Sequence, residues 1–322
     1  MKRKRLEILL LCLLAANCAN GQASVDNPAP DKQSTGAQNA ARRNNEKRSA
    51  ADLKAEFERI ARKSGGRVGV AATVLETGDT VSFNAGERFP LQSVYKLPIA
   101  MAIFSQVEAG KIKLDQKLRI EKDEVSKSST VLSAEKFPNG VERSVEELLR
   151  LTVSESDNTA SDALLKLAGG AGAVMNYLGE LGIEEIVVAN YEKELHADWQ
   201  AQYRNYATPK AAIELLGALQ ASRGISEPNR ARLLRFMIES PTGPRRLKGL
   251  LPAGTTVAHK TGTSGTRKNL TPATNDIGIV DLPDGRHLAV AVFVADSSAD
   301  QTTREETIAK IARAAFEYWS EK

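Results

Sequence analysis

Residues 91–98 read LQSVYKLP and place Ser93 three residues before Lys96, at the start of an apolar run that continues to Gly110. This pattern predicts a helix that begins at the serine. Side chains three apart on a helix share a face, so the Lys96 amine is expected beside the Ser93 hydroxyl. A neighbouring base makes a serine nucleophilic, and the free N–H groups of a helix start can bind an oxyanion. Taken alone, the spacing also fits a capping serine followed by a surface lysine.

A second motif, Ser-Asp-Asn at 156–158, follows a helix whose start is predicted at Ser144. Its structural alternative is a turn or a helix start, which these residue types favour. Its functional interpretation is a Ser156 hydroxyl that relays a proton and an Asn158 amide that holds a substrate carbonyl.

The third motif, residues 259–264 with the sequence HKTGTS, ends a β-branched run predicted to be a strand. The alternative is a lysine near a turn on a solvated strand. Functionally, a cation and hydroxyls on one strand edge can bind a carboxylate, and a glycine leaves room for a ligand backbone. The residues are Lys260, Thr261, Gly262, Thr263 and Ser264.

In this order and at these distances, the three motifs resemble those of the penicillin-interacting serine enzymes. The resemblance covers roughly residues 51–319. A fourth segment, 188–199 (VANYEKELHADW), looks like the Ω-loop of class A serine β-lactamases, with Glu192 at the position of the general base. Long irregular loops in compact domains are usually functional, whereas Glu192 considered alone would be an ordinary solvated acid.

Departures from the usual class A pattern resemble the extended-spectrum PER/VEB-type branch. His196 stands where an asparagine usually helps to hold the hydrolytic water, and an inserted TRKNL at 266–270 suggests a wider cleft. The familiar arginine is absent at Thr274, and Arg246 is the candidate replacement cation behind Lys260.

The resemblance implies hydrolysis of the β-lactam ring of penicillins and cephalosporins through a serine acyl-enzyme, which gives antibiotic resistance, with an extended spectrum. The implied catalytic residues are Ser93, Lys96, Ser156, Glu192 and Thr263. The implied substrate-binding residues are Asn158, His196, Lys260, Thr261, Ser264 and Arg246. Either Lys96 or Glu192, acting through a water, takes the proton during acylation. No cofactor or metal is implied, and the partner is a small-molecule β-lactam.

Three rival functions share part of this pattern. A cell-wall transpeptidase or carboxypeptidase would lack a deacylating glutamate, and Glu192 argues against it. A β-lactam sensor domain that stays acylated should be joined to membrane spans. A serine–lysine glutaminase should not carry this Ω-loop.

Strand signals lie near both ends of the chain, at 68–75 and 80–83 and then around Val257, at 277–282 and at 287–295. Residues 93 to about 238 are predicted to be mostly helical. We therefore expect an α/β (α+β) fold with a mixed antiparallel sheet built from both chain ends. Terminal helices would flank that sheet, and an all-helical subdomain would be inserted into it.

The composition is that of a globular protein, with 42% apolar and 26% charged residues among 322. The formal charge of +4 falls to +1 without residues 1–21, which hold four basic residues and one acidic residue. The chain shows no basic patch with interleaved aromatics, which disfavours nucleic acid as a partner. Its three histidines lack metal-site spacing, which disfavours a metal-dependent hydrolase.

Residues 1–21 have the pattern of a secretory signal, which predicts a periplasmic location. Cleavage after Gly21 would release a soluble protein, whereas lipidation of Cys18 would tether it to a membrane. Residues 22–50 have linker composition, and 51–322 form the expected catalytic domain, which we expect to be monomeric. Both cysteines, Cys12 and Cys18, lie in the leader, so the domain is expected to have no disulfide.

Overall fold

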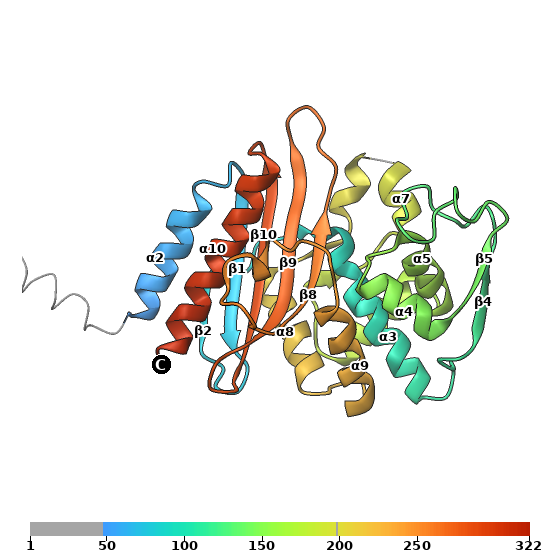
Figure 1. Ribbon diagram of the computed structural model, residues 1–322, viewed down its shortest axis with the longest axis horizontal. Helices are drawn as coiled ribbons and strands as arrows, with labels where there is room; N and C mark the ends of the chain where they lie inside the picture. The colour runs from blue at the N-terminus through green and yellow to red at the C-terminus, as the bar shows by residue number, and fades with distance from the viewer. Residues whose placement is uncertain (1–47, 198) are drawn as a thin grey trace, which may run out of the picture. The chain divides into compact units, whose positions relative to one another are not determined.

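A five-stranded antiparallel sheet with the order β2-β1-β10-β9-β8 joins the two ends of the chain (Figure 1). The computed structural model describes residues 48–197 and 199–322, and these form one compact unit. The strands are β1 (Arg67–Val74), β2 (Thr80–Phe83), β8 (Val257–Thr263), β9 (Thr271–Asp281) and β10 (His287–Ser297). The predicted antiparallel sheet from both chain ends is confirmed.

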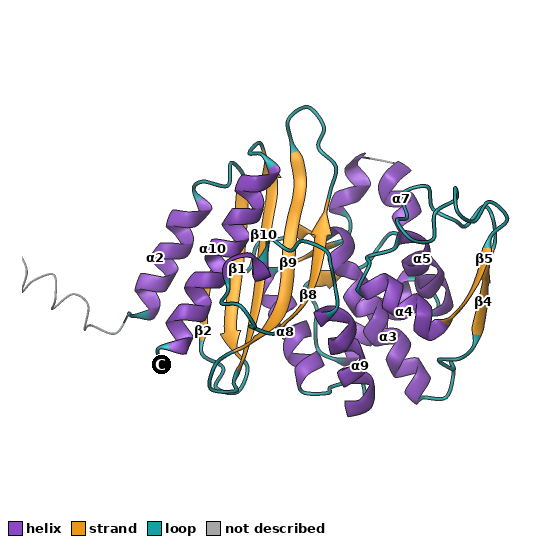
Figure 2. Ribbon diagram, in the orientation of Figure 1, coloured by secondary structure: helices purple, strands orange, loops and turns teal. Residues whose placement is uncertain are grey.

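The two faces of the sheet carry separate hydrophobic cores, because successive side chains on a strand point to opposite sides. On β10, Leu288, Val290, Val292 and Val294 pack in the core shared with α2 (Ala50–Ala61) and α10 (Gln301–Ser320). The alternate residues Ala289, Ala291, Phe293 and Ala295 belong to the core shared with the other helices. Figure 2 shows α2 and α10 side by side, and these helices cover the first face.

Between β2 and β8 the chain is mainly helical, as expected. The α-helices are α3 (Lys96–Glu108), α4 (Val145–Val153), α5 (Asn158–Leu167), α6 (Ala171–Glu180), α7 (Glu192–Ala197), α8 (Pro209–Gln220) and α9 (Glu227–Ile238). The 3-10 turns are η1 (Gln92–Tyr95), η2 (Trp199–Tyr203) and η3 (Leu247–Leu250). The region differs from an all-helical one because it also holds two small sheets. These are β3 (Phe89–Pro90), β7 (Tyr206–Ala207) and β6 (Ile186–Val187), and β4 (Lys117–Ile120) with β5 (Val141–Ser144).

The predicted helix start at Ser144 is confirmed, because its side chain accepts a hydrogen bond from the backbone of Glu147. Thr208 caps α8 in the same way by accepting from Ala211. Ser226 is the N-cap residue of α9, but its side chain makes no capping bond. Among the described residues, no helix is both long and apolar enough to cross a membrane.

Candidate active site

Ser93 does not begin an α-helix, contrary to the sequence-based expectation. It lies half-buried in the 3-10 turn η1, and α3 starts three residues later at Lys96. The preceding Gln92 has φ of 48°, a left-handed conformation that an α-helix cannot contain, so no α-helix extends back through residue 92. Ser93 therefore sits on a sharp turn at the entrance to α3.

The central sheet holds this turn in place. The buried Asn275 amide on β9 donates hydrogen bonds of 2.7 and 3.1 Å to the carbonyls of Pro90 and Leu91. A Cβ on Gly262 would lie 2.3 Å from the Leu91 carbonyl oxygen. The glycine was expected to make room for a ligand backbone. Here it lets β8 approach the protein's own nucleophile segment.

Lys96 connects three of the four sequence motifs. Its side chain is fully buried, and Nζ donates to Asn158 Oδ1 at 2.6 Å and to the Ser156 carbonyl at 2.7 Å. Glu192 Oε1 lies 3.2 Å from the same nitrogen. An ammonium has three donors, so these three acceptors offset the desolvation cost of the buried charge. The fold thus brings together Lys96, Ser156, Asn158 and Glu192, as predicted.

A second buried lysine approaches Ser156 from the sheet. Lys260 Nζ donates to Ser156 Oγ at 2.9 Å and to the Thr261 carbonyl at 3.1 Å. Burial, and next the nearby Lys96 cation, lower the pKa of Lys260 well below its usual value. Ser156 itself has φ of 56°, a strained conformation for a non-glycine residue. This strain turns its carbonyl to Lys96 and its hydroxyl to Lys260.

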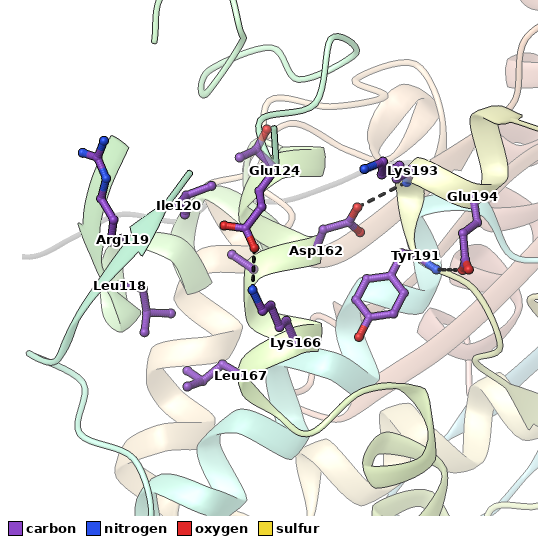
Figure 3. A pocket seen from close by; sticks show the side chains of 12 residues that line it. Leu118, Arg119, Ile120, Glu124, Asp162, Lys166, Leu167, Tyr191, Lys193 and Glu194 are labelled. Atoms are coloured by element: carbon purple, nitrogen blue, oxygen red, sulfur yellow. Dashed lines mark hydrogen bonds and ion pairs between the residues drawn. The ribbon is translucent and has the colours of Figure 1, made fainter. Parts of the chain in front are cut away.

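Glu192 begins the short helix α7 and is 4% exposed. Asp162 on α5 accepts hydrogen bonds from the backbone N–H groups of Glu192 (2.8 Å) and Lys193 (3.2 Å), the latter drawn in Figure 3. Burial raises the pKa of Asp162 to about 6, although these N–H groups oppose the shift. Sequence reasoning missed Asp162. A usable signal was its position four residues after Asn158, on the same face of α5.

The Ω-loop segment is more regular than expected. Most of it forms α7 and η2, so the interpretation of an irregular loop is wrong for these residues. The backbone of His196 lies in α7, but its side chain is outside the described part, and its predicted role stays a prediction.

Next to the start of α7, a cavity of about 730 Å³ is lined by Asp162 and by the ring of Tyr191 (Figure 3).

The inserted loop between β8 and β9 extends beyond the strands in Figure 1. Within it, Arg267 and Leu270 close a tight turn through paired backbone hydrogen bonds. The Arg267 guanidinium lies 5.7 Å from the ring centroid of Trp199. The insertion therefore contacts the Ω-loop segment, and the predicted wider cleft stays a prediction.

The three hydroxyls of the third motif have different surroundings. Thr263 is exposed, and its Oγ1 accepts a 2.7 Å hydrogen bond from Arg246 Nη2. Thr261 is buried, and its hydroxyl pairs with that of Thr242 at 2.8 Å. Ser264 is half-buried and hydrogen-bonded to the backbone of Ala273.

Arg246 lies behind this strand edge and is 3% exposed. Besides Thr263, its guanidinium donates to the carbonyls of Asn275 (3.0 Å) and Gly262 (3.3 Å). Glu305 Oε1 lies 3.5 Å from Nε. Burial lowers the pKa of Arg246, and the charges of Asp276 and Glu305 oppose this shift.

The position of the missing arginine has a different neighbour. The Thr274 hydroxyl accepts a 2.9 Å hydrogen bond from Nε of Arg304 on α10. The mostly buried Arg304 was not anticipated from the sequence, because a 30-residue separation between helix and strand follows no local pattern.

Within residues 48–197 and 199–322, no cluster of three or more His, Cys, Asp or Glu side chains could hold a metal ion.

Comparison with known proteins places this site in context. The family model described as "Beta-lactamase enzyme family" matches residues 52–319. The chain is 44% identical to the extended-spectrum beta-lactamase PER-1 of Pseudomonas aeruginosa, over 83% of this chain and 87% of that protein. It is 37% identical to the beta-lactamase VEB-1 of the same organism, over 84% and 91%. Its fold matches the crystal structure of the TLA-1 extended-spectrum beta-lactamase with a TM-score of 0.82 and 39% identity, over 85% of this chain and all of that one.

Proposed function

This chain belongs to the class A β-lactamases and hydrolyses β-lactams, and from that premise we propose that Ser93 is the nucleophile of an acyl-enzyme that Glu192 helps to clear. The observation that carries the proposal is the shared contact of Lys96 Nζ with Asn158, Ser156 and Glu192. It joins the Lys96 amine to the backbone of the Ser-Asp-Asn motif and to the carboxylate that would activate water.

In acylation, the Ser93 hydroxyl attacks the lactam carbonyl and its proton passes to Lys96, or through a water to Glu192. Backbone N–H groups of Ser93 and Thr263 stabilise the oxyanion, at about 3–4 kcal/mol per donor. The ring C–N bond then breaks, and the Ser156 hydroxyl gives a proton to the leaving nitrogen. Its hydrogen bond from Lys260 supports this role, because that lysine orients the hydroxyl.

In deacylation, Glu192 takes a proton from a water, which attacks the acyl carbonyl and releases the Ser93 oxygen. A transpeptidase would have no such group, and the ion pair supports this role because it holds the Glu192 carboxylate beside Lys96, a residue of the nucleophile's own motif. Asp162 supports the same step by fixing the backbone at the start of α7.

We assign the substrate carboxylate to the edge of β8, where Lys260, Thr263 and Arg246 meet. Thr261 and Ser264 belong to the same edge. Hydrogen bonds to Thr242 and Ala273 hold their hydroxyls in place. Asn158 has two roles: it positions Lys96, and it binds the amide of the substrate side chain. His196 is assigned to the water site on the resemblance alone.

Arg246→Ala should raise KM for penicillins and cephalosporins and weaken inactivation by clavulanate. A lost charge-assisted contact of this type costs about 1.5–3 kcal/mol, or roughly ten- to a hundredfold in kcat/KM. The burial of Arg246 against Glu305 adds a loss of thermal stability, so kinetics are measured well below the melting temperature. Arg245→Ala is the matched control, because Arg245 is exposed and also pairs with Glu305. Equal behaviour of the two variants would refute the assignment.

The substrate range follows from the insertion beside β8 and from Gln92, which stands where carbapenem-hydrolysing relatives often carry a cysteine. We expect efficient hydrolysis of ceftazidime and cefotaxime, with kcat/KM for imipenem at least about tenfold lower, a barrier difference of about 1.4 kcal/mol. Steady-state rates of purified residues 51–322 across penicillins, cephalosporins and carbapenems test this. Efficient imipenem turnover, or no activity on the two cephalosporins, would contradict the proposal.

The location and assembly are also proposals. We assign residues 1–21 to a signal peptide, 22–47 to a linker and 48–322 to a monomeric catalytic domain exported to the periplasm. Because Ser49 caps α2, it supports a domain start a few residues before the expected residue 51. Lipidation at Cys18 and cleavage after Gly21 are the two alternatives for the leader. The leader and linker assignments rest on sequence composition, since residues 1–47 lie outside the described part of the chain.

A further inference from the structure

A buried histidine–carboxylate pair lies directly behind the carboxylate-binding edge. His259 on β8 and Asp276 on β9 are both 0% exposed, and Nδ1 lies 2.9 Å from Oδ2. Gly278 faces His259 in the strand register, and a Cβ there would lie 2.8 Å from the His259 Cβ. The glycine therefore makes the space in which the imidazole reaches Asp276. Among the described residues, neither member of the pair is hydrogen-bonded to Ser93, Lys96 or Glu192.

The hydrogen bonds of the pair define its protonation pattern. A carboxylate accepts, so the Asp276 contact places a proton on His259 Nδ1. Nε2 is buried and has no hydrogen-bond partner among the described residues. The Nδ1–H of His259 therefore donates to the Asp276 carboxyl group and fixes its orientation.

Asp276 also holds the segment that carries Arg246. Its Oδ2 accepts a 3.1 Å hydrogen bond from the backbone N–H of Leu247, the residue after Arg246. The guanidinium of Arg246 donates to the carbonyl of Asn275, the residue before Asp276. Two consecutive residues of β9 thus fix Arg246 at its backbone and at its head group. The negative charge of Asp276 also opposes the drop that burial causes in the pKa of Arg246.

We propose that Asp276, oriented by His259, is a positioning residue that holds Arg246 in place for the substrate carboxylate. The inference rests on the carboxylate-binding role proposed above for Arg246. It gives a function to two buried polar residues that take no part in acylation or deacylation. Their effect on the reaction passes through Arg246, so it should depend on the substrate carboxylate.

The test compares a penicillin with its methyl ester, which keeps the lactam and removes the negative charge. Asp276→Asn should raise KM for the free acid about tenfold with kcat little changed, because misplacement by a fraction of an ångström weakens a directional contact. The ester should react equally with the variant and the parent. In the Arg246→Ala background, Asp276→Asn should add little further loss, since both act on one contact.

His259 supplies a matched pair of variants in case Asp276→Asn folds poorly. His259→Asn keeps a side-chain N–H close to the place of Nδ1 and should retain the parent KM. His259→Leu has a similar size but no donor, and it should raise KM for the acid alone. Thermal melts of each variant confirm that the comparison is made on folded protein.

Two results would overturn the inference. The first is an equal loss on acid and ester for Asp276→Asn and His259→Leu, which would mean a general structural role. The second is a fully additive loss in the Arg246→Ala background. If Arg246→Ala itself fails to distinguish acid from ester, the proposed role of Arg246 falls and removes the premise of the inference. The acid and ester rates of Arg246→Ala alone reveal a failure of the proposed Arg246 role, separately from the results for Asp276→Asn.

Discussion

Glu192→Gln is expected to react with a penicillin as fast as the parent, within a few-fold, and then to remain acylated. Glutamine keeps the shape and the backbone bond to Asp162, but its amide cannot take a proton from water. Loss of a general base of this kind slows its step by about 10²–10⁴-fold. Intact-mass spectrometry after mixing should show a persistent adduct with the mass of protein plus one penicillin.

The matched control is Glu194→Gln in the same helix. Glu194 is exposed, and its carboxylate accepts from the backbone of Tyr191, which an amide oxygen can also do. This variant should turn over like the parent and show no lasting adduct. If Glu192→Gln clears the adduct at the parent rate, Glu192 is not the deacylating base.

Lys96→Met is expected to lose both activity and stability. Removing the amine takes away a group that we propose as acceptor of the Ser93 proton, and acylation by nitrocefin should slow by about 10³-fold or more. The change also removes the Lys96 half of an ion pair with Glu192, which is 4% exposed. Breaking a buried pair in this way costs about 3–5 kcal/mol, which thermal or urea unfolding would detect.

The double variant Lys96→Met/Glu192→Gln separates these two effects. With both charges gone, stability should return toward that of the parent while activity stays lost. Stopped-flow acylation and unfolding curves on the same samples give both numbers. Acylation of Lys96→Met at the parent rate would contradict the prediction and leave Glu192 as the proton acceptor in that step.

The catalytic geometry could be predicted where a residue's role is local in the sequence. Lys96, Lys260 and the Ser-Asp-Asn motif, all identified from local sequence patterns, are groups that the fold brings within hydrogen-bond distance, whereas the expected contact of Lys96 with the Ser93 hydroxyl stays a prediction. The strands at both chain ends were visible because their apolar runs are long. The start of α3 was misplaced by three residues, because an apolar run does not distinguish a 3-10 turn from the first turn of an α-helix.

The remaining parts depend on contacts between distant segments. Asp162 accepts hydrogen bonds from backbone N–H groups 30 and 31 positions further along the chain, and almost every residue carries such a group, so only its place on the helix face of Asn158 pointed to it. The hydrogen bond from Arg304 to Thr274 also joins two separate elements, so no local pattern predicts it. The two small sheets were missed because strands of two to four residues are too short to show an alternating pattern.

The pairing of β1 with β10 has a consequence for how the protein folds. Arg67 lies beside Ala295 in the register, so the central sheet joins residues more than two hundred positions apart. Contacts of such separation slow folding, because a long chain must close before they form. The turn before Ser93 depends on Asn275 of β9, so it is completed only after the C-terminal strands have docked. A chain that ends before β9 would keep the nucleophile, its lysine and Glu192 and still be inactive, and refolding should restore hydrolysis only in its last phase.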